Sequence, residues 1–284
     1  MLTIFTIPKP FTGLIRIIQR NAIKNWVQLI PECEVILFGN DIGVEEVAQE
    51  LGVRYFSSIE KNEYGTPLLS SAFGVAQEQA RNDILMYANS DIIFSQDLVE
   101  AISKVDKSLF LVCGRRWDLD VKEEIDFGDG HAVGQLLDRL KKEGKLHGLS
   151  GLDYFVFPRG AVHMRSFPVG RPGWDSWLIY DMRRRGVPVI DATEAITAIH
   201  QNHDYSHSIF GEQKRVGGPE LLRNIEIAGG MRNFLSLRDA DWVLDKGGLK
   251  RPYFPRRIWS LLSQYYPYRV VLSLKRNLQM RMGF

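Results

Sequence analysis

A polar triplet interrupts the apolar segment ILMYANSDIIF, which spans residues 84–94. Asn89, Ser90 and Asp91 follow residues typical of a buried strand, and the apolar run resumes directly after them. An unpaired carboxylate in apolar surroundings costs several kcal/mol, so Asp91 needs a partner. A divalent cation with a diphosphate would supply one. The alternative is that Asn89 and Asp91 only cap a turn.

Three histidines lie close together further along the chain, in the segment AIHQNHDYSH. The spacing of His200, His203 and His207 could suggest zinc. No Cys or Glu that would complete a closed zinc site lies near them in the sequence, so we do not expect one. A single histidine in a metal shell and a purely structural role for all three stay open.

The elements that must position these side chains alternate regularly in the first half of the chain. Short β-branched apolar runs alternate with segments of helical period, which predicts βαβ units and a mostly parallel sheet. Ligands of such sheets bind beyond the carboxyl ends of the strands. We expect strands at 2–7, 34–40, 53–56, 84–94 and 108–114, and the intervening helices include 67–80.

The second half is less regular. It predicts a helix around 133–140, a strand at 154–158, a helix at 175–185 and a strand at 187–192. Beyond Thr193 we expect loops and short helices.

The strand, the acidic motif, the short apolar run and the helix that follows resemble the metal-binding D-x-D element of GT-A fold, family 2-like glycosyltransferases. The resemblance covers roughly residues 1–205. It implies a Rossmann-like α/β fold, with a mostly parallel central sheet flanked by helices. In that family the last Asp of the motif holds Mn²⁺ or Mg²⁺ on the nucleotide diphosphate, and Asp91 matches it. Asn89 replaces the first Asp, and it can bind a ribose or a metal-bound water but brings no charge.

A literal D-x-D occurs at Asp118 and Asp120, next to Arg115, Arg116 and Trp117. It lacks the apolar continuation and the helix that follow the metal motif in the family. The segment KEEID behind it is typical of a solvated surface. We therefore prefer Asp91 as the metal ligand.

The segment GRPGWDSWLIYDMRRRG resembles the later acidic motif of inverting family members, in which a carboxylate at a helix start deprotonates the acceptor hydroxyl. Asp175 is the matching residue. A sugar hydroxyl is a poor nucleophile, so an inverting enzyme needs a positioned base. Trp174 and Trp177 could offer apolar faces to sugar rings. In the alternative reading Asp175 is only an N-cap and both tryptophans belong to the core.

The same resemblance suggests further site residues. GT-A enzymes often complete the metal shell with a His after the helix that carries the base, and His200 matches it best, with His203 as second choice. Nucleotide-pocket candidates follow the first two strands, with a cation before the metal strand: Thr6, Ile7, Pro8, Asn40, Asp41 and Arg81. Asp153 is expected to bind a donor or acceptor hydroxyl, or to sit in a turn. Each of these has an ordinary surface or turn role as its alternative.

The charge distribution divides the chain into a body, 1–245, and a C-terminal segment, 246–284. The segment holds nine of the 36 basic residues and none of the 34 acidic ones, together with several aromatic residues. It predicts an amphipathic helical extension that contacts an anionic membrane surface, or that packs on the acidic body. Nucleic acid is not expected, because no recognised binding motif accompanies the charge.

Cys33 and Cys113 lie in or beside apolar runs, as expected of reduced, buried thiols. No run approaches the roughly 18 apolar residues of a membrane span, and no leader pattern opens the chain. We expect a cytoplasmic protein, at the inner face of the membrane if the tail binds lipid.

These observations predict a metal-dependent glycosyltransferase of the hexosyltransferase type, active in polysaccharide biosynthesis. We expect it to transfer a sugar from a nucleotide diphosphate donor, with UDP favoured, to a hydroxyl on a glycan or lipid-linked acceptor, with inversion. Two other classes stay open. One is a non-catalytic nucleotide-sugar or glycan-binding protein. The other is a sugar nucleotidyltransferase, although TIPKPFTG is not the Gly-rich phosphate loop of that class.

Overall fold

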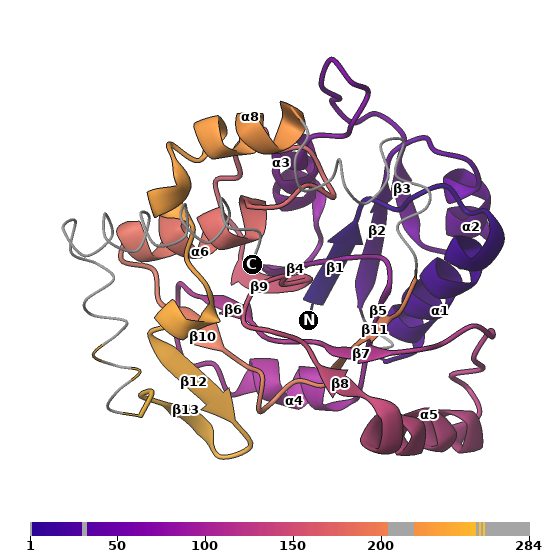
Figure 1. Cartoon of the computed structure of the whole chain (residues 1–284). Coiled ribbons are helices and arrows are strands. Elements are labelled where there is room, and N and C mark those ends of the chain that lie inside the picture. The colour runs from indigo at the N-terminus through magenta and orange to yellow at the C-terminus, as the bar shows by residue number, and fades with distance from the viewer. Residues whose placement is uncertain (1, 30–32, 204–218, 254–255, 257, 259–284) are drawn as a thin grey trace, which may run out of the picture.

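The computed structural model describes residues 2–29, 33–203, 219–253, 256 and 258 (Figure 1). Its central sheet contains β1 (Leu2–Thr6), β2 (Glu34–Phe38), β3 (Arg54–Phe56), β4 (Ile84–Ala88), β6 (Leu111–Cys113), β9 (Tyr154–Pro158), β10 (Val189–Asp191), β12 (Trp242–Asp245) and β13 (Gly248–Lys250). The strand order is β13-β12-β10-β6-β9-β4-β1-β2-β3. Strands β4, β1, β2 and β3 are parallel neighbours, and β9 runs antiparallel between β4 and β6. The predicted α/β fold with a mostly parallel sheet is confirmed.

A second, smaller sheet has the order β5-β11-β7-β8. Its strands are β5 (Ile92–Phe94), β7 (Trp117–Leu119), β8 (Lys145–Leu146) and β11 (Ala198–Gln201). The run 84–94, expected as one strand, therefore divides at the polar triplet, with β4 in the central sheet and β5 in the small one. The triplet lies where the chain passes between the two sheets.

Helices cover both faces of the central sheet (Figure 1). Side chains alternate between the two faces along each strand, so both faces carry apolar residues that the helices bury. Phe5 of β1 packs with the helices α3 (Leu69–Gln79) and α6 (Trp174–Arg184), whereas Ile4 packs with α1 (Gly13–Leu29), α2 (Val44–Glu50) and α4 (Asp97–Ser103). The small sheet packs against α5 (Gly130–Glu143). Further helices in the described part of the chain are α8 (Pro219–Ile227) and the short 3-10 turns Met231–Asn233 and Leu237–Asp239. No helix in the described part of the chain is long and apolar enough to cross a membrane.

The expectation of only loops and short helices beyond Thr193 is wrong. Strand β11 completes the small sheet, and β12 and β13 extend the central sheet as an antiparallel pair. These strands are short and partly polar, so their hydrophobic periodicity gave no signal. The hairpin crosses the predicted boundary between residues 245 and 246.

Most of the segment 246–284 lies outside the described residues, and so does its expected helix. Two of its described cations pair with acidic residues of the body. Lys250 pairs with Glu194 and Asp245, and Arg256 donates to Oδ2 of Asp191 at 2.7 Å. For these residues the structure agrees with packing on the acidic body.

One carboxylate holds together the amino-terminal edge of the central sheet. Glu34, the first residue of β2, accepts hydrogen bonds from the hydroxyl of Thr3 at 2.7 Å, from Arg54 at 2.5 Å and from the main-chain N–H of Arg81 at 2.7 Å. Burial acts to raise the pKa of the Glu34 carboxyl, but these hydrogen bonds outweigh it, and the pKa is lowered.

We therefore predict a pH-dependent loss of stability in Glu34→Gln. A lowered pKa stabilises the fold above the unfolded value of about 4.3, and this contribution disappears as the pH falls through the folded pKa. Near neutral pH the substitution should cost about 1–3 kcal/mol of unfolding free energy. Denaturant unfolding from neutral to acidic pH should show this difference shrinking. The exposed Glu46→Gln serves as control, and an equal response from both variants would contradict the assignment.

Candidate active site and metal centre

Asp91 is a buried carboxylate directly beyond the carboxyl end of β4. Its Oδ2 lies 3.2 Å from Nε2 of His203, 3.9 Å from Nε2 of His200 and 3.9 Å from Nζ of Lys9. Its Oδ1 is buried with no hydrogen-bond partner among the described residues. The position agrees with the rule that polar residues beyond strand ends form the ligand sites of α/β sheets.

The small sheet brings these groups together. In β11, His200 lies opposite Ile92 of β5 on one side and opposite Asp118 of β7 on the other. The main-chain N–H of Gln201 also donates to the carbonyl of Asp91 at 3.2 Å. Residues far apart in the sequence thus meet because β5, β11 and β7 are neighbours.

The charge of Asp91 is well compensated. Burial acts to raise the pKa of its carboxyl, but the hydrogen bond from His203 and the charges of His200 and Lys9 outweigh it and hold the pKa well below its usual range. The carboxylate is therefore ionised at neutral pH.

Asp91, His200 and His203 offer ligand atoms that all lie within 4.8 Å of one another. One carboxylate and two imidazoles are a common donor set for divalent first-row metals. The buried Oδ1 atom that lacks a partner fits this use, since a cation would satisfy it. The residues present therefore fit a divalent metal, and the two nitrogen ligands favour Mn²⁺ over Mg²⁺, which prefers oxygen.

The cluster opens into a cavity of about 360 Å³. Several residues expected at the site line it together with the metal cluster: Ile7, Pro8, Asp41, Asn89, Ser90 and Asp153. The loops after β1, β2 and β4 supply most of them, as expected for a site at the carboxyl edge of parallel strands.

Three residues expected at the nucleotide pocket do not line this cavity. Thr6 is fully buried within β1, and Asn40 is exposed and accepts a hydrogen bond from Lys61 at 3.0 Å. Arg81 precedes β4 and lies beside Glu34, so it belongs to the opposite edge of the sheet. The expectation for Arg81 came from its resemblance to a basic residue that precedes the metal strand and faces the diphosphate, but the whole length of β4 separates Arg81 from Asp91.

Asp175 lies in the first turn of α6, behind the cavity wall. Its Oδ2 accepts from the main-chain N–H of Leu152 at 3.4 Å, and the next residue, Asp153, lines the cavity. Burial raises the pKa of the Asp175 carboxyl. Trp174 packs against Tyr87, and Trp177 packs against Phe167. Both tryptophans are buried in the core and neither lines the cavity.

Asn89 is part of a buried polar network with Asp153. Its Nδ2 donates to Oδ1 of Asp153 at 2.5 Å, and its Oδ1 accepts from the hydroxyl of Tyr87 at 3.2 Å. Arg116 forms an ion pair with the other oxygen of Asp153. Burial acts to lower the pKa of the Arg116 guanidinium, but the charge of Asp153 outweighs it, and the pKa is raised. Asn89 thus supplies the hydrogen-bond donor that the neighbouring carboxylate of Asp153 requires.

The two residues of the literal D-x-D have different positions. Asp118 lies in β7 beside His200, with its Oδ1 3.2 Å from Nδ1 of that ring. Asp120 is exposed and accepts a hydrogen bond from Asn202 at 2.8 Å. Neither belongs to the group that could hold the metal in the described part of the chain.

Sequence reasoning missed three residues. Lys9 and Arg171 line the cavity, and Arg171 pairs with Glu220 at 2.5 Å. Gln19 of α1 accepts from the hydroxyl of Ser90 at 2.7 Å and from the N–H of Lys9 at 2.7 Å. Lys9 could have been found as a cation directly after the first strand. The sequence did not indicate a role for Gln19, because a polar residue in an amphipathic helix usually faces water. His207 lies outside the described residues.

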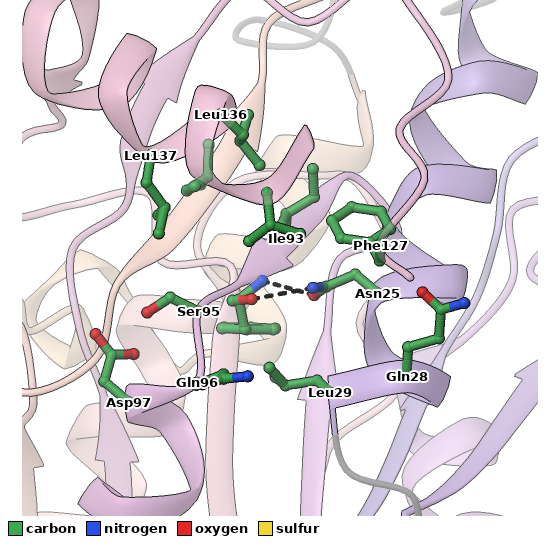
Figure 2. Close-up of a pocket in the computed structure, with 13 residues that line it drawn as sticks. Asn25, Gln28, Leu29, Ile93, Ser95, Gln96, Asp97, Phe127, Leu136 and Leu137 are labelled. Carbon is green, nitrogen blue, oxygen red and sulfur yellow. Dashed lines mark hydrogen bonds between the residues drawn. The ribbon is translucent and has the colours of Figure 1, made fainter. Parts of the chain in front are cut away.

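A second cavity, of about 350 Å³, lies between the small sheet and the helices α1 and α5, which all contribute lining residues (Figure 2). Ile199 lines it, whereas the adjacent His200 faces the metal cluster. Its walls are mostly apolar, and the amide of Asn25 is bonded to both main-chain groups of Phe94. The carboxylate of Asp97 accepts hydrogen bonds from the main-chain N–H and the hydroxyl of Thr197.

No family model matches the sequence, and no curated protein matches it. Among solved structures, the chain is similar to glucosyl-3-phosphoglycerate synthase from Mycobacterium tuberculosis, at 16% identity and a TM-score of 0.47 over 81% of each chain. The same synthase in complex with Mn²⁺, uridine diphosphate and phosphoglyceric acid shows 14% identity and a TM-score of 0.47, over 81% of this chain and 79% of that chain. These similarities concern the course of the chain, and the functional proposal rests on the site.

We predict that Asn89→Asp, which would create a D-x-D at residues 89–91, destabilises the folded protein. It places a second carboxylate against Asp153 and removes the donor, at a cost of about 2–4 kcal/mol in unfolding free energy. The double variant Asn89→Asp/Asp153→Asn restores one donor and one acceptor and should recover part of this loss. Chemical denaturation of the parent, both single variants and the double variant measures the coupling. A more stable Asn89→Asp protein would contradict this account.

Proposed function

We propose that this protein is a metal-dependent glycosyltransferase of the GT-A type, which transfers a sugar from a nucleotide diphosphate donor to a hydroxyl acceptor. The observation that carries the proposal is the cluster of Asp91, His200 and His203 beyond the end of β4. The cluster opens into a cavity of about 360 Å³, within the range of roughly 300–1,000 Å³ that is usual for small-molecule sites.

The charges around the cavity suit a diphosphate. A divalent cation held by Asp91, His200 and His203 would offset the negative charge on the leaving group. Lys9, whose side chain is 43% exposed, lies 3.9 Å from Asp91 and can reach a phosphate beside the cluster. Arg171 lines the same cavity. We assign the nucleoside to the part formed by Ile7, Pro8 and Asp41, and UDP remains the favoured donor nucleotide.

We assign the role of general base to Asp175, in an inverting reaction. Its carboxyl accepts from the main-chain N–H of Leu152, the residue that precedes the cavity-lining Asp153. Burial raises the pKa of the Asp175 carboxyl, toward the neutral range in which a base works best. Asp153 itself is held by Arg116 and Asn89, and its role is to accept a hydrogen bond from a sugar hydroxyl. The acceptor, on a glycan or a lipid, stays a prediction from the sequence.

The first test is thermal stability against nucleotide diphosphates and nucleotide sugars, with and without Mn²⁺. A ligand that binds the folded state raises the melting temperature, by about 4–8 °C at roughly 100 times its Kd. We expect a shift that requires both metal and nucleotide, with Mn²⁺ more effective than Mg²⁺.

Asp91→Asn should abolish the shift, because the amide cannot supply the anionic ligand. Asp120→Asn is the matched control and should keep it. If no nucleotide shifts the parent protein with any metal, the transferase proposal fails. A shift without sugar transfer or donor hydrolysis would instead favour the non-catalytic binding protein.

The role of Asp175 is tested separately in Asp175→Asn. The amide can still accept from the N–H of Leu152 but cannot take up a proton. If Asp175 is the base, kcat should fall by about 10²–10⁴-fold while the metal-dependent thermal shift by the donor is unchanged. A loss of folding stability with kcat intact would show that the residue only caps α6.

A further inference from the structure

Asp118 lies at the centre of β7 and contacts three side chains. Its Oδ1 lies 3.0 Å from Nε of Arg116 and 3.2 Å from Nδ1 of His200, and its Oδ2 lies 2.8 Å from Nδ1 of His147. The proposed function gives it no task. Its side chain is only 23% exposed, so these neighbours replace most of its contact with water.

His200 presents its two ring nitrogens to two different carboxylates. Nε2 faces the metal cluster, 3.9 Å from Oδ2 of Asp91, and Nδ1 faces Asp118. A neutral imidazole carries its proton on one nitrogen and can bind a metal only through the other. The group beside Nδ1 therefore decides whether Nε2 is available as a ligand.

The contact between His200 and Asp118 has the distance of a hydrogen bond but not its alignment, so Nδ1 is a buried polar atom without an aligned partner. The Asp118 carboxylate has two aligned partners of its own. Arg116 binds it from one side and His147 from the other, and Arg116 is itself paired with the buried Asp153. A carboxylate held in this way offers a fixed acceptor to a ring that is only 7% exposed.

We propose that Asp118 is a positioning residue for the metal site, which keeps the proton of His200 on Nδ1 and so leaves Nε2 free to bind the cation. Outer carboxylates of this kind orient metal-bound histidines and strengthen them as ligands. The inference rests on the proposed function for the metal itself. It also gives the literal D-x-D a role, with Asp118 supporting the metal site one imidazole away from it.

The first experiment reads the tautomer of His200 in the metal-free protein, by ¹⁵N NMR of the histidine rings at a pH where the ring is neutral. The signal is assigned by its loss in His200→Gln. We expect the Nδ1–H form in the parent and in Asp120→Ala, and a shift toward the Nε2–H form in Asp118→Ala. An Nε2–H ring in the parent, or no change in Asp118→Ala, would overturn the proposal.

The second experiment titrates Mn²⁺ into the full-length protein without nucleotide, followed by calorimetry or by the EPR signal of free Mn²⁺. Asp118→Ala should weaken binding by about 10–100-fold, and Asp120→Ala should leave it unchanged. Asp118→Asn retains an oxygen acceptor without the charge, so its affinity for Mn²⁺ should lie between those of Asp118→Ala and Asp120→Ala. This variant also serves if the alanine protein does not fold.

The outcomes separate the two proposals. If the parent binds Mn²⁺ and both Asp118 variants bind it equally well, the positioning role is wrong and the metal site stands. If the parent binds no metal while its His200 ring is in the Nδ1–H form that Asp118→Ala removes, the proposed function fails and the positioning of the ring stands.

Discussion

The structure depends on one buried carboxylate at the point where the chain leaves the central sheet. Asp91 follows β4 and precedes β5, which belongs to the other sheet, and its side chain is almost completely removed from water. Such a charge is tolerated only where opposite charge and hydrogen-bond donors surround it. His200, His203 and Lys9 supply these, and each comes from a loop or strand that the small sheet or the end of β1 brings into place.

The same requirement extends outward from Asp91. Asp153 lies near it and is neutralised by Arg116, which also binds Asp118, which in turn contacts His200. Asn89 fits this arrangement because it donates to Asp153 without adding negative charge. An amide at position 89, in place of a second carboxylate, therefore suits the neighbouring carboxylate of Asp153. Metal chemistry at this site would depend on pairs formed across both sheets.

The sequence predicts the strands and helices of the first half well, because buried parallel strands read as apolar runs and amphipathic helices show a clear period. Asp91, Asp41 and Asp153 could be chosen because each ends or precedes such a run, and the structure places all three at one cavity. The misplacement of Arg81 and the omission of Lys9 have one cause. Both depart from the rule that ligands bind beyond the carboxyl ends of parallel strands, since Arg81 precedes β4, whereas Lys9 follows β1. The short strands β11, β12 and β13 carry too few residues for a periodic signal.

Gln19 limits how the loop after β1 can be redesigned. Its amide bonds the N–H and the carbonyl of Lys9, and the same oxygen accepts from Ser90. The loop after the first strand and the turn that carries Asp91 are therefore fastened to one side chain of α1. Lengthening or grafting the loop at residues 8–12 would move the anchoring of Asp91 as well, so the two segments have to be exchanged as one module together with Gln19.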